Sequence, residues 1–530
     1  MRMKIIILNR ISHKRPFLFL SLHIGLLLLL GSLKISAAQN DQLLFSTYLG
    51  GNLADTAAAI ATDPAGNVYL TGSTQSILFP AARAINHGVD VDEYAHGVHG
   101  VDVFVAKFNS DGSELVYVLW FNAINAADVD EGYGIAVDSS GSAYVTGHTR
   151  SADFCTLFGD VPGYDTTHNG DSDAFLLKVK PDGSGLDYCT FVGGSDWDIA
   201  RAVILDTNNN AIISGATWST DFPITNDAIQ STNTGQRDIF IAQLDASGTE
   251  LTYASYWGGT GQEETRGMAL GTNGNLALAG WSNSTDLPTT PDSFAPDYGG
   301  EFDGFLLQLS SDLDEIDFAT YLGGSGEDRA TAVVLDDHNT VTVSGYTLSS
   351  DFPISPSAYQ SNLAGGWDSF VLRLGAGARA EHGRSGHSLR YSTYLGGSGD
   401  DESLGLVVDT NGIATVTGTT NSTDFPITPQ AYTATLAGEQ DVFVAQISPN
   451  GRQLLYGSYL GGLENDGGTA VVQTTPNSFI FTGSTRSTDF PTTPGAYDTR
   501  PNGDYDIFVT QLTLISEALL HQIYLPLIQN

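Results

Sequence analysis

Basic residues are scarce in this 530-residue chain, which holds 22 Lys and Arg against 60 Asp and Glu. Six of the basic residues fall in residues 1–38, which contain no acid, so residues 39–530 carry a net charge of −44. A surface of this sign repels phosphate backbones and anionic lipids, whereas it attracts cations and favours solubility. We therefore expect no nucleic-acid partner.

Long apolar runs are lacking beyond the N-terminus, where residues 17–33 (FLFLSLHIGLLLLLGSL) follow several basic residues. The segment KISAAQ comes next, with the small residues Ser36 and Ala38 placed for cleavage after Ala38. This order predicts a secretory signal peptide over residues 1–38, and the alternative is an uncleaved membrane anchor. No later segment has the roughly 18 apolar residues of a spanning helix. We expect a secreted or cell-surface protein with no transmembrane segment after cleavage.

Catalytic signatures are also lacking. The chain has no G-x-S-x-G, H-E-x-x-H or P-loop motif, the patterns that carry an activated serine, a zinc ion or a nucleotide phosphate. The only cysteines are Cys155 and Cys189, and export permits a disulfide between them. The sequence therefore predicts no enzyme of these classes.

What the chain does have is a seven-fold repeat. Segments of the type YSTYLGG recur seven times, at Phe45, Tyr117, Tyr188, Tyr253, Phe318, Tyr391 and Tyr456. An Asp-x-Phe motif recurs at Asp102, Asp173, Asp238, Asp303, Asp368, Asp441 and Asp506. Both series share a basic period of 65 residues, and a fixed period of this kind is the signature of a repeat architecture.

Each unit contains four short strand-like runs, for example 404–409, 414–418, 441–447 and 454–462. Alternating β-branched and aromatic residues, separated by turn residues, predict antiparallel strands. Seven four-stranded units predict an all-β, seven-bladed β-propeller over residues 39–514. The N-terminal strand, residues 43–49, is expected to complete the last blade, which has no fourth strand of its own. Residues 515–530 are expected to form a C-terminal tail outside the blades.

The motifs YSTYLGGSGDD, VDTNG, TVTGTTNSTDFPITPQAY and DVFVAQI closely resemble the bacterial seven-bladed beta-propeller repeat (SBBP repeat) family. The resemblance covers about residues 43–514. It implies an exported or cell-surface bacterial propeller of no assigned activity, and it supplies no catalytic residues.

Residues present in every unit are interpreted as supports of the blade. The Asp-x-Phe aspartates are expected to cap backbone N–H groups at the start of the third strand. The S-x-D-F-P loops, with Asp221, Asp351, Asp424 and Asp489, are expected to form local turns whose Phe packs between blades.

Acids that follow the glycine pair are harder to assign, because every unit contributes some in varying number. We expect them to ring one mouth of the central channel, solvated or neutralised in part by Arg201, Arg266 and Arg329. Clustered carboxylates repel one another and bind hard cations such as Ca²⁺. A Ca²⁺ site is therefore a hypothesis, although no twelve-residue Ca²⁺-loop motif is present. Its candidate ligands are Asp196, Asp198, Glu327, Asp328, Asp400 and Asp401.

Three further features break the symmetry. Residues 85–102 carry His87, His96 and His99 among acids, which suits either a transition-metal site or a polar loop. Residues 375–390, with Arg379, Arg384 and Arg390, add a basic patch to a turn on the opposite face, which suits either a solvated hairpin or a docking site for an anionic glycan or partner. Cys155 and Cys189 replace repeated residues in the same unit only, which favours a disulfide between them.

We expect a binding or adhesion module for a protein or glycan ligand. The alternatives are an extracellular glycan lyase or hydrolase that uses carboxylates at the channel mouth, and a purely structural envelope protein. An enzyme should gather non-repeated polar residues in one pocket, whereas a scaffold can use the ring evenly.

Overall fold

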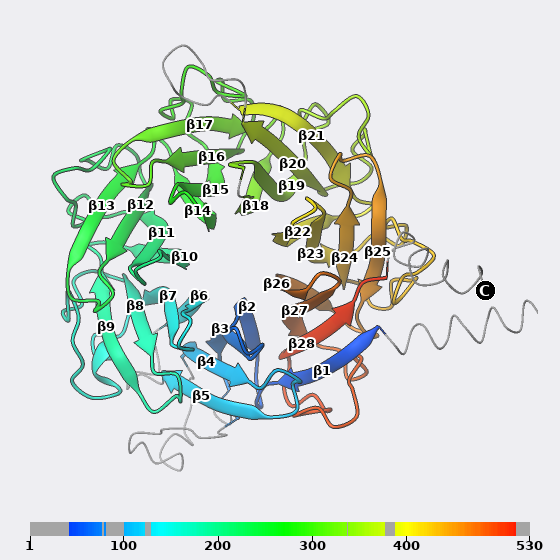
Figure 1. Cartoon of the computed structure of the whole chain (residues 1–530), viewed down its shortest axis with the longest axis horizontal. Coiled ribbons are helices and arrows are strands. Elements are labelled where there is room, and N and C mark those ends of the chain that lie inside the picture. The colour runs from blue at the N-terminus through cyan, green and yellow to red at the C-terminus, as the bar shows by residue number, and fades with distance from the viewer. Residues whose placement is uncertain are drawn as a thin grey trace, which may run out of the picture.

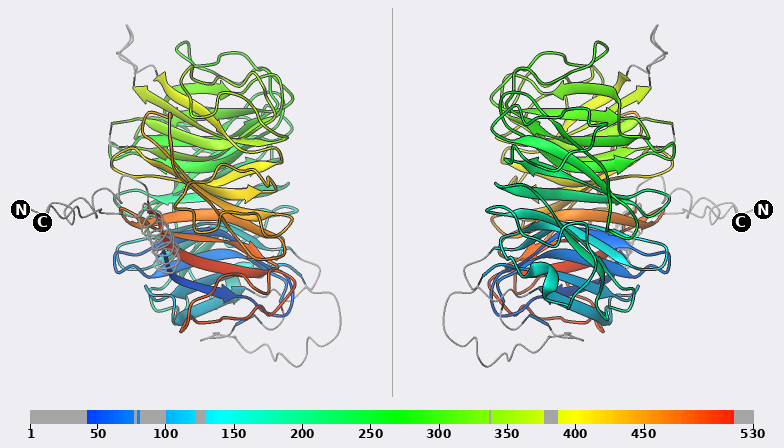
Figure 2. Two further views of the ribbon diagram at one scale, coloured as in Figure 1. Left: turned by 90° about the vertical axis from the view of Figure 1, so that its right-hand side faces the viewer. Right: turned by 90° about the vertical axis from the view of Figure 1, so that its left-hand side faces the viewer.

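Seven four-stranded antiparallel sheets surround a central axis in the computed structural model (Figure 1). The structure describes residues 42–76, 79–80, 100–121, 129–336, 338–376 and 387–515. The side views show a single ring of blades, with no second domain within these ranges (Figure 2). The predicted seven-bladed β-propeller is confirmed.

Strands A to D of each blade run from the axis outward. Blades 1 and 2 contain β2 (Asp55–Thr62), β3 (Val68–Thr74), β4 (Asp102–Phe108), β5 (Leu115–Phe121), β6 (Glu131–Val137), β7 (Ala143–Thr149), β8 (Asp173–Val179) and β9 (Leu186–Val192). Blades 3 and 4 contain β10 (Asp198–Leu205), β11 (Ala211–Thr217), β12 (Asp238–Leu244), β13 (Leu251–Trp257), β14 (Glu263–Leu270), β15 (Leu276–Ser282), β16 (Asp303–Leu309) and β17 (Ile316–Leu322). Blades 5 and 6 contain β18 (Asp328–Leu335), β19 (Val341–Thr347), β20 (Asp368–Ala376), β21 (His387–Leu395), β22 (Asp401–Val408), β23 (Ala414–Thr420), β24 (Asp441–Ile447) and β25 (Leu454–Leu460). Blade 7 contains β26 (Asp466–Thr475), β27 (Ser478–Thr485), β28 (Asp506–Thr513) and β1 (Leu43–Leu49).

The ring closes through its first strand. β1 pairs antiparallel with β28, and the last sheet has the order β1-β28-β27-β26. Strand D of blade 7 thus comes from the start of the propeller, as the sequence predicts. The only helix in the described residues is the short 3₁₀ segment η1 (Phe154–Thr156).

Hydrophobic cores lie between neighbouring blades. Each of the seven buried clusters draws its side chains from two adjacent sheets. Between blades 2 and 3, for example, Tyr144 and Leu176 pack with Phe240. Burial of one such side chain contributes about 1.5–3 kcal/mol, so each blade depends on both of its neighbours.

Long B-to-C loops cross the outer edge of the ring. Backbone N–H groups of strand D donate to these loops, as from Tyr256 to the carbonyl of Gln230 at 3.1 Å and from Tyr394 to Gln360 at 3.2 Å. In blade 2 a disulfide joins Cys155 in this loop to Cys189 on β9. The loops therefore cover edges that would otherwise offer unpaired backbone groups.

The repeated aspartates bind backbone groups. Asp238 accepts hydrogen bonds from the N–H groups of Thr234 at 2.9 Å and Gly235 at 3.1 Å, which is the predicted cap before strand C. Asp424 of an S-x-D-F-P loop instead accepts from the N–H and Oγ of Ser398, both at 2.8 Å. The predicted turn is present at residues 423–424, and Phe425 packs between blades 5 and 6 as expected. Asp424 in addition links the B-to-C loop to the D-to-A loop.

The predicted signal peptide (1–38) and all but the first residue of the predicted tail (515–530) lie outside the described residues. So do the histidines of the 85–102 insertion and residues 377–386 of the second insertion. In the part of the chain that the structure describes, no helix is long and apolar enough to span a membrane.

Candidate functional site

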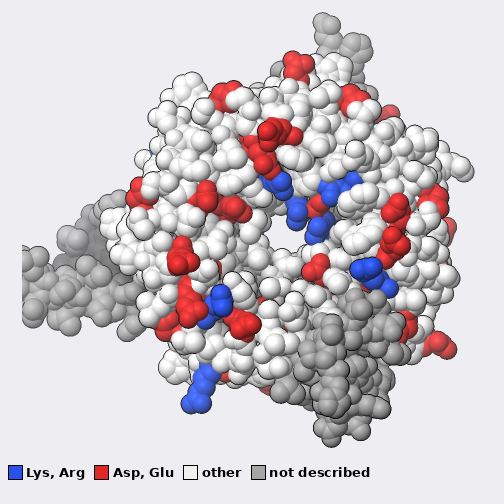
Figure 3. Space-filling view, turned by 180° about the vertical axis from the view of Figure 1, so that it is seen from behind, with Lys and Arg blue, Asp and Glu red and all other residues white. Residues whose placement is uncertain are grey.

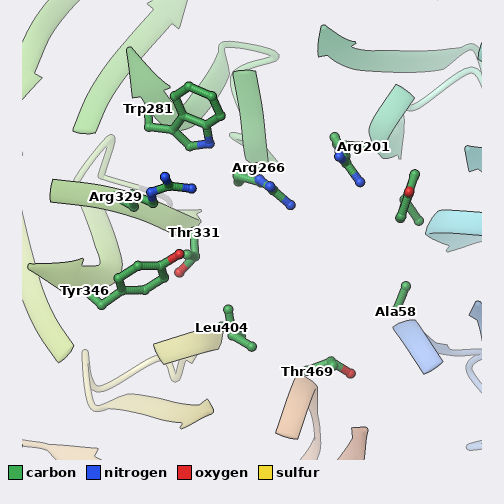
Figure 4. Close-up of a pocket in the computed structure, with 10 residues that line it drawn as sticks. Ala58, Arg201, Arg266, Trp281, Arg329, Thr331, Tyr346, Leu404 and Thr469 are labelled. Carbon is green, nitrogen blue, oxygen red and sulfur yellow. The ribbon is translucent and has the colours of Figure 1, made fainter. Parts of the chain in front are cut away.

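One residue of each innermost strand bulges toward the axis. The A–B pairing slips at the same place in all seven blades. A β-bulge leaves one residue unpaired and re-aims its side chain. The bulged residues surround a channel cavity of about 280 Å³ (Figure 4). In blade order they are Ala58, Tyr133, Arg201, Arg266, Thr331, Leu404 and Thr469.

The channel lining is asymmetric. Blades 6, 7 and 1 contribute the neutral residues Leu404, Thr469 and Ala58. Blades 2 to 5 contribute a connected network that we call the arginine–aromatic arc. The arc comprises Glu131, Tyr133, His148, Arg150, Trp197, Arg201, Trp218, Arg237, Glu264, Arg266, Trp281, Phe302, Glu327, Arg329, Tyr346 and Trp367. It holds four of the six tryptophans of the chain.

The arc carries local positive charge on an acidic protein. Its five arginines outnumber its three glutamates by two, although residues 39–530 have a net charge of −44. In Figure 3 several Lys and Arg side chains gather at the edge of the central opening, and most Asp and Glu on that face lie farther out. The channel mouth is therefore the part of the described surface best suited to an anion.

A single carboxylate orders three of the arginines. Glu264 has a side chain only 4% exposed. It pairs with Arg201 at 2.9 Å, with Arg266 at 3.0 Å and with Arg237 at 3.1 Å. Burial, followed by the field of the other arginines, lowers the pKa of Arg237, and Glu264 opposes this shift. Because the single negative charge of Glu264 is shared among three arginines, this cluster keeps positive charge that can bind another anion.

Aromatic rings hold the guanidinium groups in place. Arg237 lies between Trp218 and Trp281, with its Cζ 4.8 and 4.5 Å from the ring centroids. Arg201 stacks on Tyr133 at 4.1 Å. Such cation–π contacts contribute about 0.5–2 kcal/mol each, most when they are desolvated. The arginines are thus pre-organised.

Arg329 also lies beside the Trp281 ring. It donates from Nε to Glu327 Oε1 at 2.7 Å and lies 5.1 Å from the centroid of Trp281. Tyr346 lines the same side of the channel and meets Trp367 edge to face.

Tyr133 and His148 stack at the blade 2 end of the arc, with ring centroids 5.6 Å apart. The Tyr133 hydroxyl donates to Glu131. Burial, with help from Arg201 and Arg150, lowers the pKa of His148 to about 3. His148 is therefore neutral at physiological pH.

The six predicted cation ligands do not converge. Asp198, Asp328 and Asp401 are fully buried and turn into their own blades. Each accepts from a glycine N–H at 2.7 Å and from a serine Oγ at 2.7–2.9 Å.

The other three candidates point elsewhere. Glu327 pairs with Arg329, Asp400 accepts from the N–H of Trp367 at 3.0 Å, and Asp196 is exposed. No group of three or more His, Cys, Asp or Glu in the described ranges could hold a metal ion. The six candidates therefore do not gather at one point of the mouth, because Asp198, Asp328 and Asp401 accept from the loops beside them. The Ca²⁺ site stays a prediction.

The arc itself was not predicted. Symmetry identifies the repeated residues as structural, but it does not indicate which non-repeated residues share a position in the blade. Aligning the seven units at the Asp-x-Phe motif would have placed Arg201 and Arg266 at equivalent positions in strand A. Neutralisation of the acids by Arg201, Arg266 and Arg329 was the one part anticipated: the first two pair with Glu264, and Arg329 pairs with Glu327.

Comparisons with known proteins agree with the repeat. The SBBP beta-propeller repeat model matches residues 44–80, 120–154 and 390–426. The regulatory protein FlaEY of Caulobacter vibrioides is 23% identical over 313 residues, which is 56% of this chain. The chain spans only 30% of the length of that relative.

Similar solved structures have low identity. Sqt1 from Chaetomium thermophilum is 12% identical with a TM-score of 0.39, and the match covers 90% of this chain and 99% of that one. BamB from Moraxella catarrhalis is 12% identical with a TM-score of 0.37, covering 89% and 99%. The polysaccharide lyase Uly1 is 9% identical with a TM-score of 0.43, covering 90% and 98%.

Proposed function

We propose that this propeller, which carries SBBP beta-propeller repeats, is an exported binding module that holds an acidic glycan at the arginine–aromatic arc of its channel. The observation that carries the proposal is the gathering of non-repeated Arg and Trp residues on blades 2 to 5. A residue needed by every blade would recur seven times, whereas these residues gather in neighbouring blades on one side of the channel.

The chemistry of the arc supports an anionic ligand. Arg and Trp are the residues that most often dominate binding energy, above all in desolvated and pre-organised surroundings. Guanidinium groups bind carboxylate and sulfate through paired hydrogen bonds. The N-terminal leader pattern supports export, and acidic glycans are abundant outside the cell.

Binding is tested with hyaluronan oligosaccharides by isothermal titration calorimetry. Arg266 is the residue to change, because its side chain is 38% exposed and Glu264 keeps two other arginines when it is removed. Arg266→Ala should weaken binding about tenfold or more, since a hydrogen bond to a charged group contributes about 1.5–3 kcal/mol.

Arg452→Ala is the matched control, because it makes the same change of charge at an exposed position in a C-to-D turn, on the opposite face. Equal affinity of wild type and Arg266→Ala would overturn the proposal, as would the absence of binding to any acidic glycan.

A second candidate is a glycan lyase acting at the same place. It is favoured by Tyr133, whose hydroxyl donates to Glu131 while its ring lies against Arg201. In this reading the arginines neutralise the uronate carboxylate and the Tyr133–Glu131 pair takes the proton from C5. The C4–O bond then breaks, and the leaving glycosidic oxygen receives a proton as the C4–C5 double bond forms. Accumulation of an unsaturated, ultraviolet-absorbing product, lost in Tyr133→Phe with binding retained, would establish it.

A further inference from the structure

Trp281 presents to the channel a polar atom that no group of the described residues satisfies. The residue is 6% exposed, lines the cavity, and has a buried Nε1–H without a hydrogen-bond partner in the part of the chain that the structure describes. A buried donor left unpaired has lost its hydrogen bonds to water without replacement, and most buried polar atoms of folded proteins are satisfied. The unpaired indole N–H therefore points to an acceptor that comes from a ligand.

Two guanidinium groups flank this N–H. Figure 4 shows the indole nitrogen of Trp281 on the side of the ring facing the space between Arg266 and Arg329. Arg266 uses Nε for Glu264, and its guanidinium projects into the channel. Arg329 lies against the Trp281 ring and is held by Glu327. We call the space between these three side chains the Trp281 niche.

The niche matches one carboxylate. A carboxylate has two oxygens that accept paired donors in a plane, the geometry that guanidinium groups favour. The surroundings of the niche limit how many further carboxylates a ligand can carry. The arc has an excess of only two positive charges. Two acids, Asp400 and Glu402, lie close enough to interact with each other on the blade beyond Arg329. A second ligand carboxylate on that side would meet these acids.

The opposite wall of the channel is neutral. Leu404 and Ala58 offer apolar surface. The Thr469 hydroxyl is already donated to the carbonyl of Ala57 at 2.8 Å. This wall suits an uncharged sugar ring better than another acid.

We propose that the site recognises a uronate flanked by neutral sugars, with the uronate carboxylate bound in the Trp281 niche by Arg266, Arg329 and the Trp281 Nε1–H. This inference rests on the proposed function and narrows it to a ligand class and a subsite.

The test follows the indole N–H resonances of the ¹⁵N-labelled full chain during titration. Trp281→Phe identifies the resonance of interest by its loss. The probes are a hyaluronan tetrasaccharide, with alternating uronate and neutral rings, a tetragalacturonate, with a charge on every ring, chitotetraose, with none, and glucose 6-sulfate.

The hyaluronan probe should shift the Trp281 resonance and bind at least tenfold more tightly than tetragalacturonate at low salt, where like-charge repulsion is least screened. Chitotetraose should leave the resonance unchanged. Trp281→Phe should weaken hyaluronan binding about tenfold, whereas Trp120→Phe, on the outer strand β5, should not.

Binding of hyaluronan with an unmoved Trp281 resonance would overturn the niche and leave the proposed function standing. Tighter binding of tetragalacturonate would overturn the requirement for neutral neighbours, and a response to glucose 6-sulfate alone would overturn the choice of carboxylate. Failure of all acidic probes to bind would overturn both the inference and the proposed function.

Discussion

Glu264 is the residue on which the arc depends most. It is the shared partner of Arg201, Arg237 and Arg266, and its neutral isostere would keep the shape while removing the charge. In other proteins, breaking a buried ion pair by removing one partner costs about 3–5 kcal/mol, because the remaining charge is left uncompensated.

We therefore expect Glu264→Gln to lower the free energy of unfolding by about 3 kcal/mol, measured by guanidinium chloride denaturation. Glu250→Gln, at an exposed turn, is the control and should change stability by less than about 0.5 kcal/mol. Equal stability of the two variants would mean that the arginines do not need this carboxylate.

The glycine pair shows, at the same scale, what recurrence can and cannot predict. Recurrence in every unit indicates that a residue is structural, but it does not indicate which groups that residue contacts. A side chain at Gly396 would place its Cβ 2.6 Å from Asp368 Oδ1 and 2.8 Å from Asp401 Oδ2. Two acids from neighbouring blades thus close over the first glycine. The sequence places these acids about 30 residues apart, so their approach becomes visible only once the blades are assembled.

The disulfide acts at the scale of elements. It ties the β7–β8 loop to the outer strand β9 within blade 2, and both sulfurs belong to buried residues. The bond closes a sequence separation of 34 residues, for which the chain-entropy account gives about 3 kcal/mol or more.

We expect Cys155→Ser/Cys189→Ser to lower the free energy of unfolding by about 3 kcal/mol and to speed proteolysis of the β7–β8 loop, read by mass spectrometry of the fragments. Addition of a reductant to the wild type should reproduce the effect. Unchanged cleavage would show that the loop is held by its backbone bonds, such as that from Cys189 N–H to the Pro162 carbonyl at 3.1 Å.

Elements were the most predictable part of the molecule, because alternation, turn residues and the 65-residue period all favour the same four strands. The bulges in strand A were not predictable. The bulged residues include Ala, Tyr, Arg, Thr and Leu, so no residue type marks the position. A bulge is defined by pairing with a neighbouring strand, and the sequence of one strand does not contain that information.

For the whole molecule, the structure changes what is expected of Ca²⁺. Because the six candidate acids have separate protein partners or face solvent, the melting temperature of residues 39–530 should be the same in EDTA and in millimolar Ca²⁺ at matched ionic strength. Differential scanning calorimetry measures this directly. A saturating rise that is lost in Asp400→Asn/Asp401→Asn would restore the cation hypothesis.

Protons should affect the ring far more than Ca²⁺, because acids are buried in pairs where neighbouring blades meet. Burial, together with an acid of the adjacent blade, raises the pKa of Asp198 and Asp368 to about 7 and that of Asp55, Asp303 and Asp466 to about 6. Between about pH 4 and these values the folded state binds more protons than the unfolded chain, whose aspartates titrate near 3.9.

The free energy of unfolding should therefore increase as the pH falls from 8 to about 5, and this gain should be lost as the pH rises through 6 to 7. Urea denaturation at constant ionic strength across this range measures it. Asp368→Asn should reduce the slope, because the variant removes one titrating partner of Asp401, whereas Asp312→Asn in an exposed turn should leave it unchanged. A protein whose stability is flat or falls over this interval would show that the hydrogen bonds from the glycine N–H and serine Oγ groups outweigh burial and keep these carboxylates charged.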